Sequence, residues 1–333
     1  MAGAVMHAQA SPRAAGAGDG ELTRQVLHGL TERPKRLSPT YLYDARGSAL
    51  FELICRQPEY YLTRTELAIM QRHGSQMALR IGSGALLLEL GSGASLKTRI
   101  LLDRLPDLAA YVPVDISRSS LGTAARAIRE SYPGLEVLPV EADFTRPFAL
   151  PAVRAEAART IVYFPGSTIG NFDAAPAVEL LALARGLAGP NGALIIGIDL
   201  VKDRERLLRA YDDAAGVTAA FNLNLLARLD RELGADFDLR AFRHAAVWNA
   251  AESRIEMHLV SLLPQRVHLA GQSIDFEVGE PIVTEHCHKY TQKSFGTLAA
   301  RAGWRVRAAW SDERGFFSVL YLEARGRTVR PRG

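Results

Sequence analysis

Short apolar runs alternate with longer amphipathic stretches through the middle of the chain. The apolar runs predict five buried strands, at residues 85–89, 109–114, 135–140, 160–164 and 193–198. Between them, apolar residues recur with the helical period and predict helices at 96–104, 117–131 and 175–188. Strands that alternate with helices indicate an α/β fold with a parallel sheet, which binds ligands at the carboxyl ends of its strands.

A different pattern flanks this alternation on both sides. On the N-terminal side, helices are predicted at 21–31, at 47–57 and from Thr63, as the N-cap, to about residue 80. After the fifth strand, a helical stretch at 203–232, with Tyr211 inside it, precedes β-hairpin material at 245–290. A helix at 292–302 and a hairpin with strands at 306–310 and 317–322 then complete the sheet. The segment from about 201 to 290 is therefore expected to be an insertion.

The composition is that of a soluble globular protein, with 48% hydrophobic and 23% charged residues in a chain of 333. The formal net charge is +4, and basic residues are mixed with acids except in a basic tail at 326–333, so no nucleic-acid partner is expected. Two cysteines suit a reducing cytoplasm. No apolar run is long enough to span a membrane. Residues 1–20, rich in Ala and Gly, are predicted to be a disordered lead-in.

The turn after the first strand of the sheet has the glycines of a nucleotide-type site. Gly91 and Gly93 allow the backbone to approach a ligand closely. A dinucleotide site needs a third glycine three residues further on, where this chain has Leu96. A NAD-dependent oxidoreductase is therefore the weaker interpretation, and an S-adenosylmethionine site is the stronger one.

Acidic residues at the ends of successive strands, Glu89, Asp115 and Asp143, support the same interpretation. Asp115 is placed to accept hydrogen bonds from ribose hydroxyls, and Asp143 and Phe144 are placed to bond to adenine and to stack on it. Lys97, early in the following helix, is placed to neutralise the carboxylate of the methionine moiety. The alternative is that the aspartates cap the helices that follow them and that Lys97 is a solvated surface residue.

The sequence His286-Cys287-His288 raises the question of a metal site. On a strand, the two histidines would share one face. A zinc site usually needs three or four protein ligands, and no convincing further ligand is spaced nearby in the sequence. No metal is therefore expected.

Several longer motifs are more specific than the glycine turn. They are Pro58–Glu66, Glu89–Gly93, Gly166–Asn171, Ala210–Asn222 and Arg254–His258. Together they make residues 21–323 resemble the L-histidine Nα-methyltransferase family of ergothioneine biosynthesis. The resemblance implies a class I (Rossmann-like) methyltransferase sheet that uses S-adenosylmethionine and carries an inserted α+β substrate-binding domain. It also implies that three methyl groups are transferred to histidine, which gives hercynine (trimethylhistidine).

The resemblance implies a discontinuous domain organisation. The substrate-binding domain would contain residues 21–63 and 201–290, and the cofactor domain residues 64–200 and 291–325. The enzyme would be a cytoplasmic monomer that acts on a free amino acid. Two alternatives stay open at this point, namely another amino acid such as tryptophan, and a module that only senses S-adenosylmethionine.

The resemblance also implies roles for individual substrate contacts. Tyr60, Asn171 and Tyr211 match residues that hold the carboxylate and amine of the amino acid, and Tyr43 matches a tyrosine close to the amine. We hypothesise that Tyr43 assists deprotonation. Further substrate contacts are expected from Gly166, Met257, Glu285 and Cys287.

Within this set, Glu285 would hold the imidazole and Met257 would line its pocket. Cys287 stands where a family member has a serine, and a thiol is the weaker hydrogen-bond partner. The cofactor contacts implied by position are Gly91, Lys97, Asp115, Asp143 and Phe144.

Overall fold

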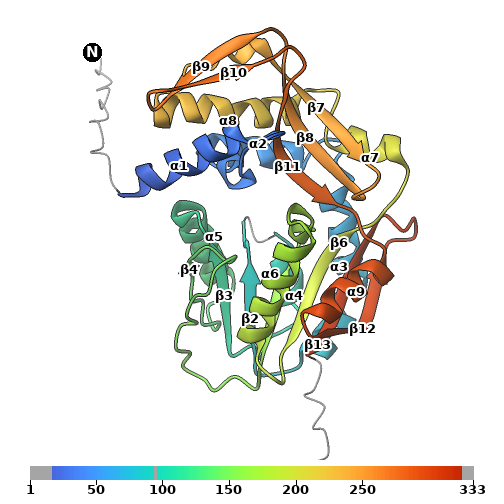
Figure 1. Cartoon of the computed structure of the whole chain (residues 1–333). Coiled ribbons are helices and arrows are strands. Elements are labelled where there is room, and N and C mark those ends of the chain that lie inside the picture. The colour runs from blue at the N-terminus through green and yellow to red at the C-terminus, as the bar shows by residue number, and fades with distance from the viewer. Residues whose placement is uncertain (1–16, 94–95, 325–333) are drawn as a thin grey trace, which may run out of the picture.

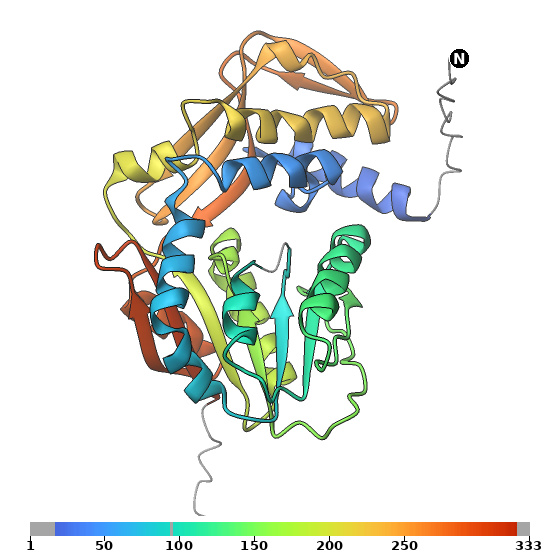
Figure 2. The same ribbon diagram turned by 180° about the vertical axis from the view of Figure 1, so that it is seen from behind.

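The structure is a computed structural model that describes residues 17–93 and 96–324 (Figures 1 and 2). The expectations for residues 1–16 and for the basic tail at 326–333 lie outside the described residues. Residues 17–20 were expected in the disordered lead-in, and this is wrong, since they form the start of helix α1, Ala17–Thr31.

The protein has two layers, which are called lower and upper by their places in Figure 1. The lower layer contains a seven-stranded sheet in the order β12-β13-β6-β5-β2-β3-β4. The strands are β2 Ala85–Leu90, β3 Ala110–Asp115, β4 Val140–Glu141, β5 Arg159–Phe164, β6 Ala193–Asp199, β12 Trp304–Ser311 and β13 Phe317–Ala324. Strand β13 is antiparallel to both of its neighbours, and the other strands run parallel to one another. The five parallel strands from β2 to β6 have the order of a doubly wound α/β sheet, so the predicted Rossmann-like fold class is confirmed.

Helices cover both faces of this sheet, which explains why its strands are apolar runs rather than alternating ones. One face packs against α3 Tyr61–Ile81, α4 Leu96–Leu102 and α5 Arg118–Ser131. The other face packs against α6 Ala174–Ala188 and α9 Gln292–Arg301. The central strands β2, β5 and β6 are therefore buried on both sides and hold the carboxyl ends of the sheet in fixed positions.

The upper layer combines the N-terminal segment with the insertion after β6. Its helical elements are α1, η1 Pro39–Leu42, α2 Ala45–Ile54, α7 Arg204–Ala210, α8 Val217–Leu233 and η3 Leu239–Ala241. Its strands are β1 Lys35–Arg36, β7 Phe242–Asn249, β8 Arg254–Ser261, β9 Gln265–Leu269, β10 Gln272–Phe276 and β11 Pro281–His288. One apolar core joins residues 26–62 to residues 207–287. Figure 1 shows this layer across the end of the lower sheet at which the parallel strands finish.

Three local predictions were wrong. Tyr211 is not inside a helix, because α7 ends at Ala210 and α8 begins only at Val217, where the Asp213 carboxylate accepts the backbone N–H groups of the first turn. Thr63 is not an N-cap, because α3 already begins at Tyr61. The third strand is reduced to β4, although Val137 still bridges to β3.

The short helix η2, Thr168–Asn171, connects the two layers. It follows β5 at the carboxyl end of the sheet and packs against β11 of the upper layer. Gly170 makes this approach possible, because a Cβ atom there would lie 2.8 Å from the backbone oxygen of His288. Among the described residues, no helix is both long enough and apolar enough to cross a membrane.

Candidate active site

The glycine turn follows β2 and lies beside the end of β3, where the Val114 carbonyl accepts the Gly91 N–H at 2.9 Å. Gly91 and Gly93 both have positive φ, at 69° and 45°, which side chains disfavour. Asp115 bridges this turn to the start of α5, because its carboxylate accepts the Gly93 N–H at 3.3 Å and the Ser117 N–H at 2.9 Å. Phe144 lies above the turn, with its Cε1 3.5 Å from where a Cβ atom of Gly91 would be. The predicted ribose and adenine contacts are thus close together.

The capping alternative for the two aspartates does not hold. The N-cap of α5 is Ser117, and no helix follows Asp143. Asp143 instead accepts hydrogen bonds from the backbone and hydroxyl of Thr145, at 2.9 and 2.6 Å. Both carboxylates therefore stabilise the loops that form the rim of this part of the site.

Lys97 is neither free nor on the surface. Its Nζ pairs with the buried carboxylate of Glu66 on α3 at 2.5 Å, and the Glu66 carboxylate also accepts the Gly166 N–H at 2.9 Å. Gly166 has a φ of 82°, and a Cβ atom there would lie 3.4 Å from Lys97 Nζ. Glu66 thus fixes the lysine beside the start of η2. Sequence reasoning missed Glu66 as a functional residue, although it ends the first quoted motif.

Glu89, considered as part of the nucleoside site, points away from it. Its buried carboxylate accepts hydrogen bonds from the hydroxyls of Thr98, at 2.7 Å, and Tyr111. Burial raises the pKa of Glu89 to about 7, against the lowering effect of these hydrogen bonds. Its role is therefore to anchor α4 to the sheet beneath the glycine turn.

The predicted tyrosines Tyr43, Tyr60 and Tyr211 lie close together in the upper layer, where all three belong to or pack against its apolar core. Tyr60 lies 6.2 Å from Tyr211, between ring centroids, and Phe51 lies 6.2 Å from Tyr60 and 5.6 Å from Tyr43. Phe221 of α8 closes the cluster, 5.5 Å from Tyr43. Residues from two stretches far apart in the sequence, 43–60 and 211–221, therefore form one aromatic wall. The sequence analysis predicted the helix at 47–57 but did not assign Phe51 to the site.

Asn171, Glu285 and Cys287 form a second wall opposite these rings. The Asn171 side-chain amide donates to Glu285 at 3.2 Å, and the Cys287 thiol lies 3.5 Å from Glu285 and 3.7 Å from Asn171. Met257 on β8 is the direct partner of Glu285 in the sheet. Burial raises the pKa of Glu285 to about 7, although the Cys287 contact and the charge of Lys289 lower it. Negative charge on Glu285 also contributes to the raised pKa of Tyr43, so the two walls are close enough to interact electrostatically.

Comparison with known proteins identifies the family of this chain. A family model described as "Histidine-specific methyltransferase, SAM-dependent" matches residues 22–324. The histidine N-alpha-methyltransferase of Mycolicibacterium smegmatis is 45% identical over 304 residues, which cover 90% of this chain and 93% of that protein. That of Mycobacterium tuberculosis is 43% identical over 91% of this chain and 95% of that protein. The chain belongs to this histidine-specific methyltransferase family.

A more distant relative is ergothioneine biosynthesis protein 1 of Neurospora crassa, which is 34% identical over 60% of this chain and 23% of that longer protein. The protein is thus an S-adenosylmethionine-dependent histidine methyltransferase, as the motifs predicted, and its substrate is a small molecule. The NAD-dependent alternative was wrong.

The methyltransferase also contains a buried ionic cluster that the sequence analysis did not predict. Asp199, at the end of β6, pairs with Lys202 at 2.5 Å and with Lys289 at 2.9 Å, and accepts the Tyr61 hydroxyl at 2.8 Å. Lys289 in turn donates to the Tyr211 hydroxyl at 2.7 Å. The cluster therefore connects the end of the lower sheet to a tyrosine of the aromatic wall. The one sequence signal that could have indicated this cluster was Asp199, an acidic residue at the end of a predicted strand.

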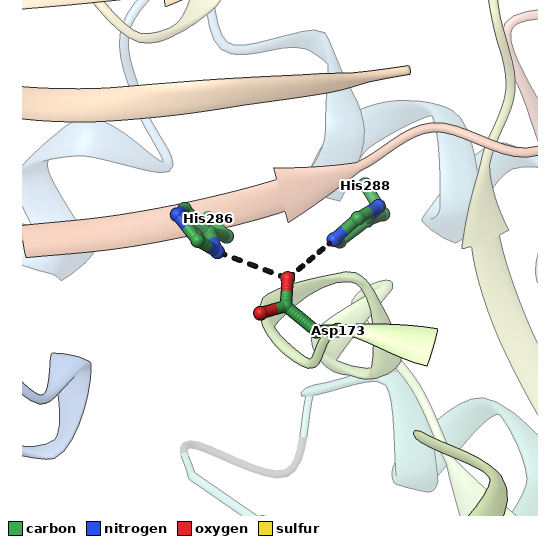
Figure 3. Close-up of side chains that lie close together, drawn as sticks. All are labelled: Asp173, His286 and His288. Atoms are coloured by element: carbon green, nitrogen blue, oxygen red, sulfur yellow. Dashed lines mark hydrogen bonds and ion pairs between the residues drawn. The ribbon is translucent and has the colours of Figure 1, made fainter. Parts of the chain in front are cut away.

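On the far side of β11, the histidines of the methyltransferase have a third neighbour (Figure 3). Asp173, the N-cap of α6, places one carboxylate oxygen 3.1 Å from His286 Nδ1 and 3.1 Å from His288 Nε2. The sequence offered no further ligand nearby, because Asp173 is distant in the chain and becomes adjacent to the histidines only in the fold.

Proposed function

We propose that this methyltransferase transfers three methyl groups in succession to the α-amino nitrogen of L-histidine, forming hercynine for ergothioneine biosynthesis. The observation that carries the proposal is the buried carboxyl of Glu285, held between Asn171 and Cys287 and facing the aromatic wall. A buried carboxyl without a cationic side chain in direct contact suits an imidazole N–H, which would supply the hydrogen bond.

The cofactor is proposed to lie along the glycine turn. Asp115 would accept the ribose hydroxyls, and Asp143 and Phe144 would bond to adenine and stack on it. Lys97 has three N–H donors, so it can hold Glu66 and still bond to the methionine carboxylate. In this proposal the lower layer, residues 64–200 and 291–325, binds the cofactor, and the upper layer, residues 21–63 and 201–290, binds the amino acid.

Each transfer is an in-line displacement. The amine lone pair attacks the methyl carbon, the carbon–sulfur bond breaks, and its electron pair stays on sulfur to give S-adenosylhomocysteine. The sulfonium activates its own methyl group, so the protein mainly supplies alignment. Gly166 at the start of η2, with Tyr60, Asn171 and Tyr211, would orient the carboxylate and amine.

The ammonium group has no lone pair until it loses a proton. Burial raises the pKa of Tyr43 well above its usual value, so Tyr43 is a neutral phenol. We therefore assign Tyr43 the role of a proton relay rather than that of a phenolate base. Its oxygen accepts the hydrogen bond from the ammonium, and as that proton is transferred the phenol O–H proton passes to water, so that Tyr43 stays neutral.

The proposal includes a cytoplasmic monomer that needs no nucleic acid or membrane. The free cysteines Cys55 and Cys287 support a reducing compartment. Light scattering on a size-exclusion column tests the oligomeric state, and a dimer would contradict this part of the proposal.

The test is incubation with S-adenosylmethionine and each of the twenty amino acids, followed by mass spectrometry. Histidine is expected to gain three methyl groups and to be preferred over tryptophan. Glu285→Gln should reduce the preference for histidine, whereas the matched control Glu256→Gln, on the other face of the same sheet, should keep it. Preferred methylation of tryptophan, or a histidine product with fewer methyl groups, would contradict the proposal.

A further inference from the structure

Three side chains with metal-ligating atoms converge behind the substrate site. The Asp173 carboxylate, His286 Nδ1 and His288 Nε2 all lie within 4.8 Å of one another. Figure 3 shows both imidazole rings directed at the same carboxylate oxygen. Because side chains alternate along a strand, His286 and His288 lie on the face of β11 opposite to Glu285 and Cys287. The cluster is therefore separate from the residues assigned to histidine and to the cofactor.

The fold holds these three groups in place from two elements. Strand β11 pairs with β8, so that His286 is opposite Glu256 and His288 is opposite Arg254. Asp173 is the N-cap of α6, a position where aspartate normally accepts a backbone N–H of the first helical turn. Its side chain makes no such bond and is turned toward the histidines instead. The carboxylate is thus oriented by the cluster rather than by the helix that it begins.

The donor set and its exposure fit a transition metal. Two imidazole nitrogens and one carboxylate oxygen bind Zn²⁺ in three-ligand sites, which leave a position for water. Ligands at about 2.0–2.1 Å in a tetrahedral site lie roughly 3.3–3.4 Å apart. The two nitrogen–oxygen separations are 3.1 Å, and the two imidazole nitrogens lie within 4.8 Å of each other. The histidine side chains are 10% and 12% exposed, whereas that of Asp173 is 46% exposed, so an ion can enter from the Asp173 side.

Arg254 opposes a cation at this position, because its guanidinium donates at 2.8 Å to Asp173 Oδ1, the oxygen that both histidines face. Its charge is offset by Glu256, which accepts from the same guanidinium at 2.8 Å. Hydrogen bonds from a second layer of residues to a ligating carboxylate are also common in metal sites. Arg254 can therefore orient Asp173 without excluding an ion.

We propose that Asp173, His286 and His288 bind one divalent transition-metal ion of the Zn²⁺ class. Both imidazoles would present a lone pair to the ion in place of the N–H that now faces Asp173, with the proton on the other ring nitrogen. The ion would connect the start of α6, two residues after Asn171, to the back of the strand that carries Glu285. Its role is to join these two elements, and it takes no part in methyl transfer.

The test is titration of the EDTA-treated, desalted enzyme with ZnCl₂ by calorimetry and with CoCl₂ by visible absorption. We expect one ion per chain with a dissociation constant in the micromolar range or below, and cobalt d–d bands from a site with nitrogen ligands. His288→Ala and the nearly isosteric Asp173→Asn should each weaken binding by at least about tenfold, the effect of losing roughly 1.4 kcal/mol. His268→Ala is the matched control. His268 is an exposed residue of β9 that pairs with Asp236, and it belongs to no such cluster among the described residues.

Thermal unfolding gives a second measurement that does not depend on activity. An ion that binds the folded state raises its stability, so ZnCl₂ should raise the Tm of the wild type and of His268→Ala but not that of Asp173→Asn. Circular dichroism of each variant checks that it is folded. The proposal is overturned if the wild type shows no saturable binding, or if His288→Ala and Asp173→Asn bind as tightly as the wild type does.

Discussion

At the scale of single residues, Glu285 has the most informative surroundings. Its neighbours are an amide and a thiol, and its pKa of about 7 results from burial. The carboxyl is therefore protonated below pH 7 and ionised above it. Only the ionised form accepts a hydrogen bond with both of its oxygens, so the charge on this residue should control histidine binding near neutral pH.

We expect kcat/KM for histidine to rise between pH 6 and 8 as Glu285 loses its proton. Glu285→Gln should lower kcat/KM by about 10- to 100-fold, the effect of losing a hydrogen bond to a charged group, and should remove the part of the pH profile with a pKa near 7. Amine deprotonation affects both proteins equally, so the difference between their profiles isolates Glu285. Identical pH profiles for the two proteins would refute this role.

Cys287 gives a second prediction for the same carboxyl. In Cys287→Ser, a hydroxyl would replace the weakly donating thiol, and a stronger hydrogen bond to the ionised form lowers the pKa of Glu285. The rise in kcat/KM should then begin at lower pH, and KM for histidine at pH 7 should decrease several-fold. Cys55→Ser is the control, since Cys55 contacts Thr63 rather than Glu285. A profile unchanged from the wild type would show that the thiol does not affect Glu285.

The sequence predicted the residues of the site better than their partners. Tyr60, Asn171 and Tyr211 were grouped because the motifs that contain them are specific, and Tyr43 was added because the resemblance implies it by position. Partners such as Glu66, Asp173 and Asp199 were not predicted to act there, because each becomes significant only through a buried contact with a residue far away in the sequence. No local pattern contains that information.

At the scale of elements, β11 shows why strand periodicity was insufficient. Thr284 is an extra residue in this strand, since the pairing with β8 shifts between Val283 and Glu285. Because of this bulge, Ile282 and Glu285 both face the upper core, although they are three positions apart in the sequence. The Thr284 hydroxyl donates to Asn222 at 2.7 Å and is thereby satisfied. A period of two, applied to the sequence, would have placed Glu285 on the opposite face.

The contact between η2 and β11 gives a prediction at this scale. In Gly170→Ala, the new Cβ atom would lie 2.8 Å from the His288 backbone oxygen and would push η2 away from β11. We expect a loss of about 1–3 kcal/mol in the free energy of unfolding and a higher KM for histidine, because Asn171 moves away from Glu285.

Gly186→Ala in α6 is the matched control for this change. No atom lies within 4 Å of its Cβ position, so it should be neutral or slightly stabilising. Denaturant unfolding and steady-state kinetics measure both effects. Equal stability of the two variants would show that the approach of η2 to β11 is not tight.

At the scale of the whole molecule, the two layers are joined by the buried cluster around Asp199. In Asp199→Asn, Lys202 and Lys289 would keep their burial and lose their counter-charge, so we expect a loss of about 3–5 kcal/mol in the free energy of unfolding. Burial already lowers the pKa of Lys202 to about 8, and the variant should lower it further. Guanidinium unfolding at pH 7 measures the change.

Glu313→Gln is the control for Asp199→Asn, since it removes an exposed ion pair with Arg72 that should contribute at most about 1 kcal/mol. If the two variants unfold at the same denaturant concentration, the Asp199 cluster does not stabilise the connection between the layers.

The order of strands and helices in the lower layer was predictable, because each strand is buried on both faces and forms a continuous apolar run. The elements of the upper layer were harder to predict from the sequence. Strand β7 has mostly half-exposed residues, and the break at Tyr211 depends on the Asp213 cap and on Gly216 with its φ of 70°. The insertion itself was visible as the point where the alternation stopped.

The discontinuous upper layer has a consequence for synthesis on the ribosome. Helices α1 and α2 are translated before the insertion. Leu42 and Ile54 share one core with Leu225 and Ile255, which are translated much later. The lower sheet is also incomplete until β13, next to β6, has been translated. The upper core therefore cannot close until most of the chain has been translated, and the lower sheet lacks its edge hairpin until then. During translation, the nascent chain exposes an apolar N-terminal segment that is a natural target for chaperones.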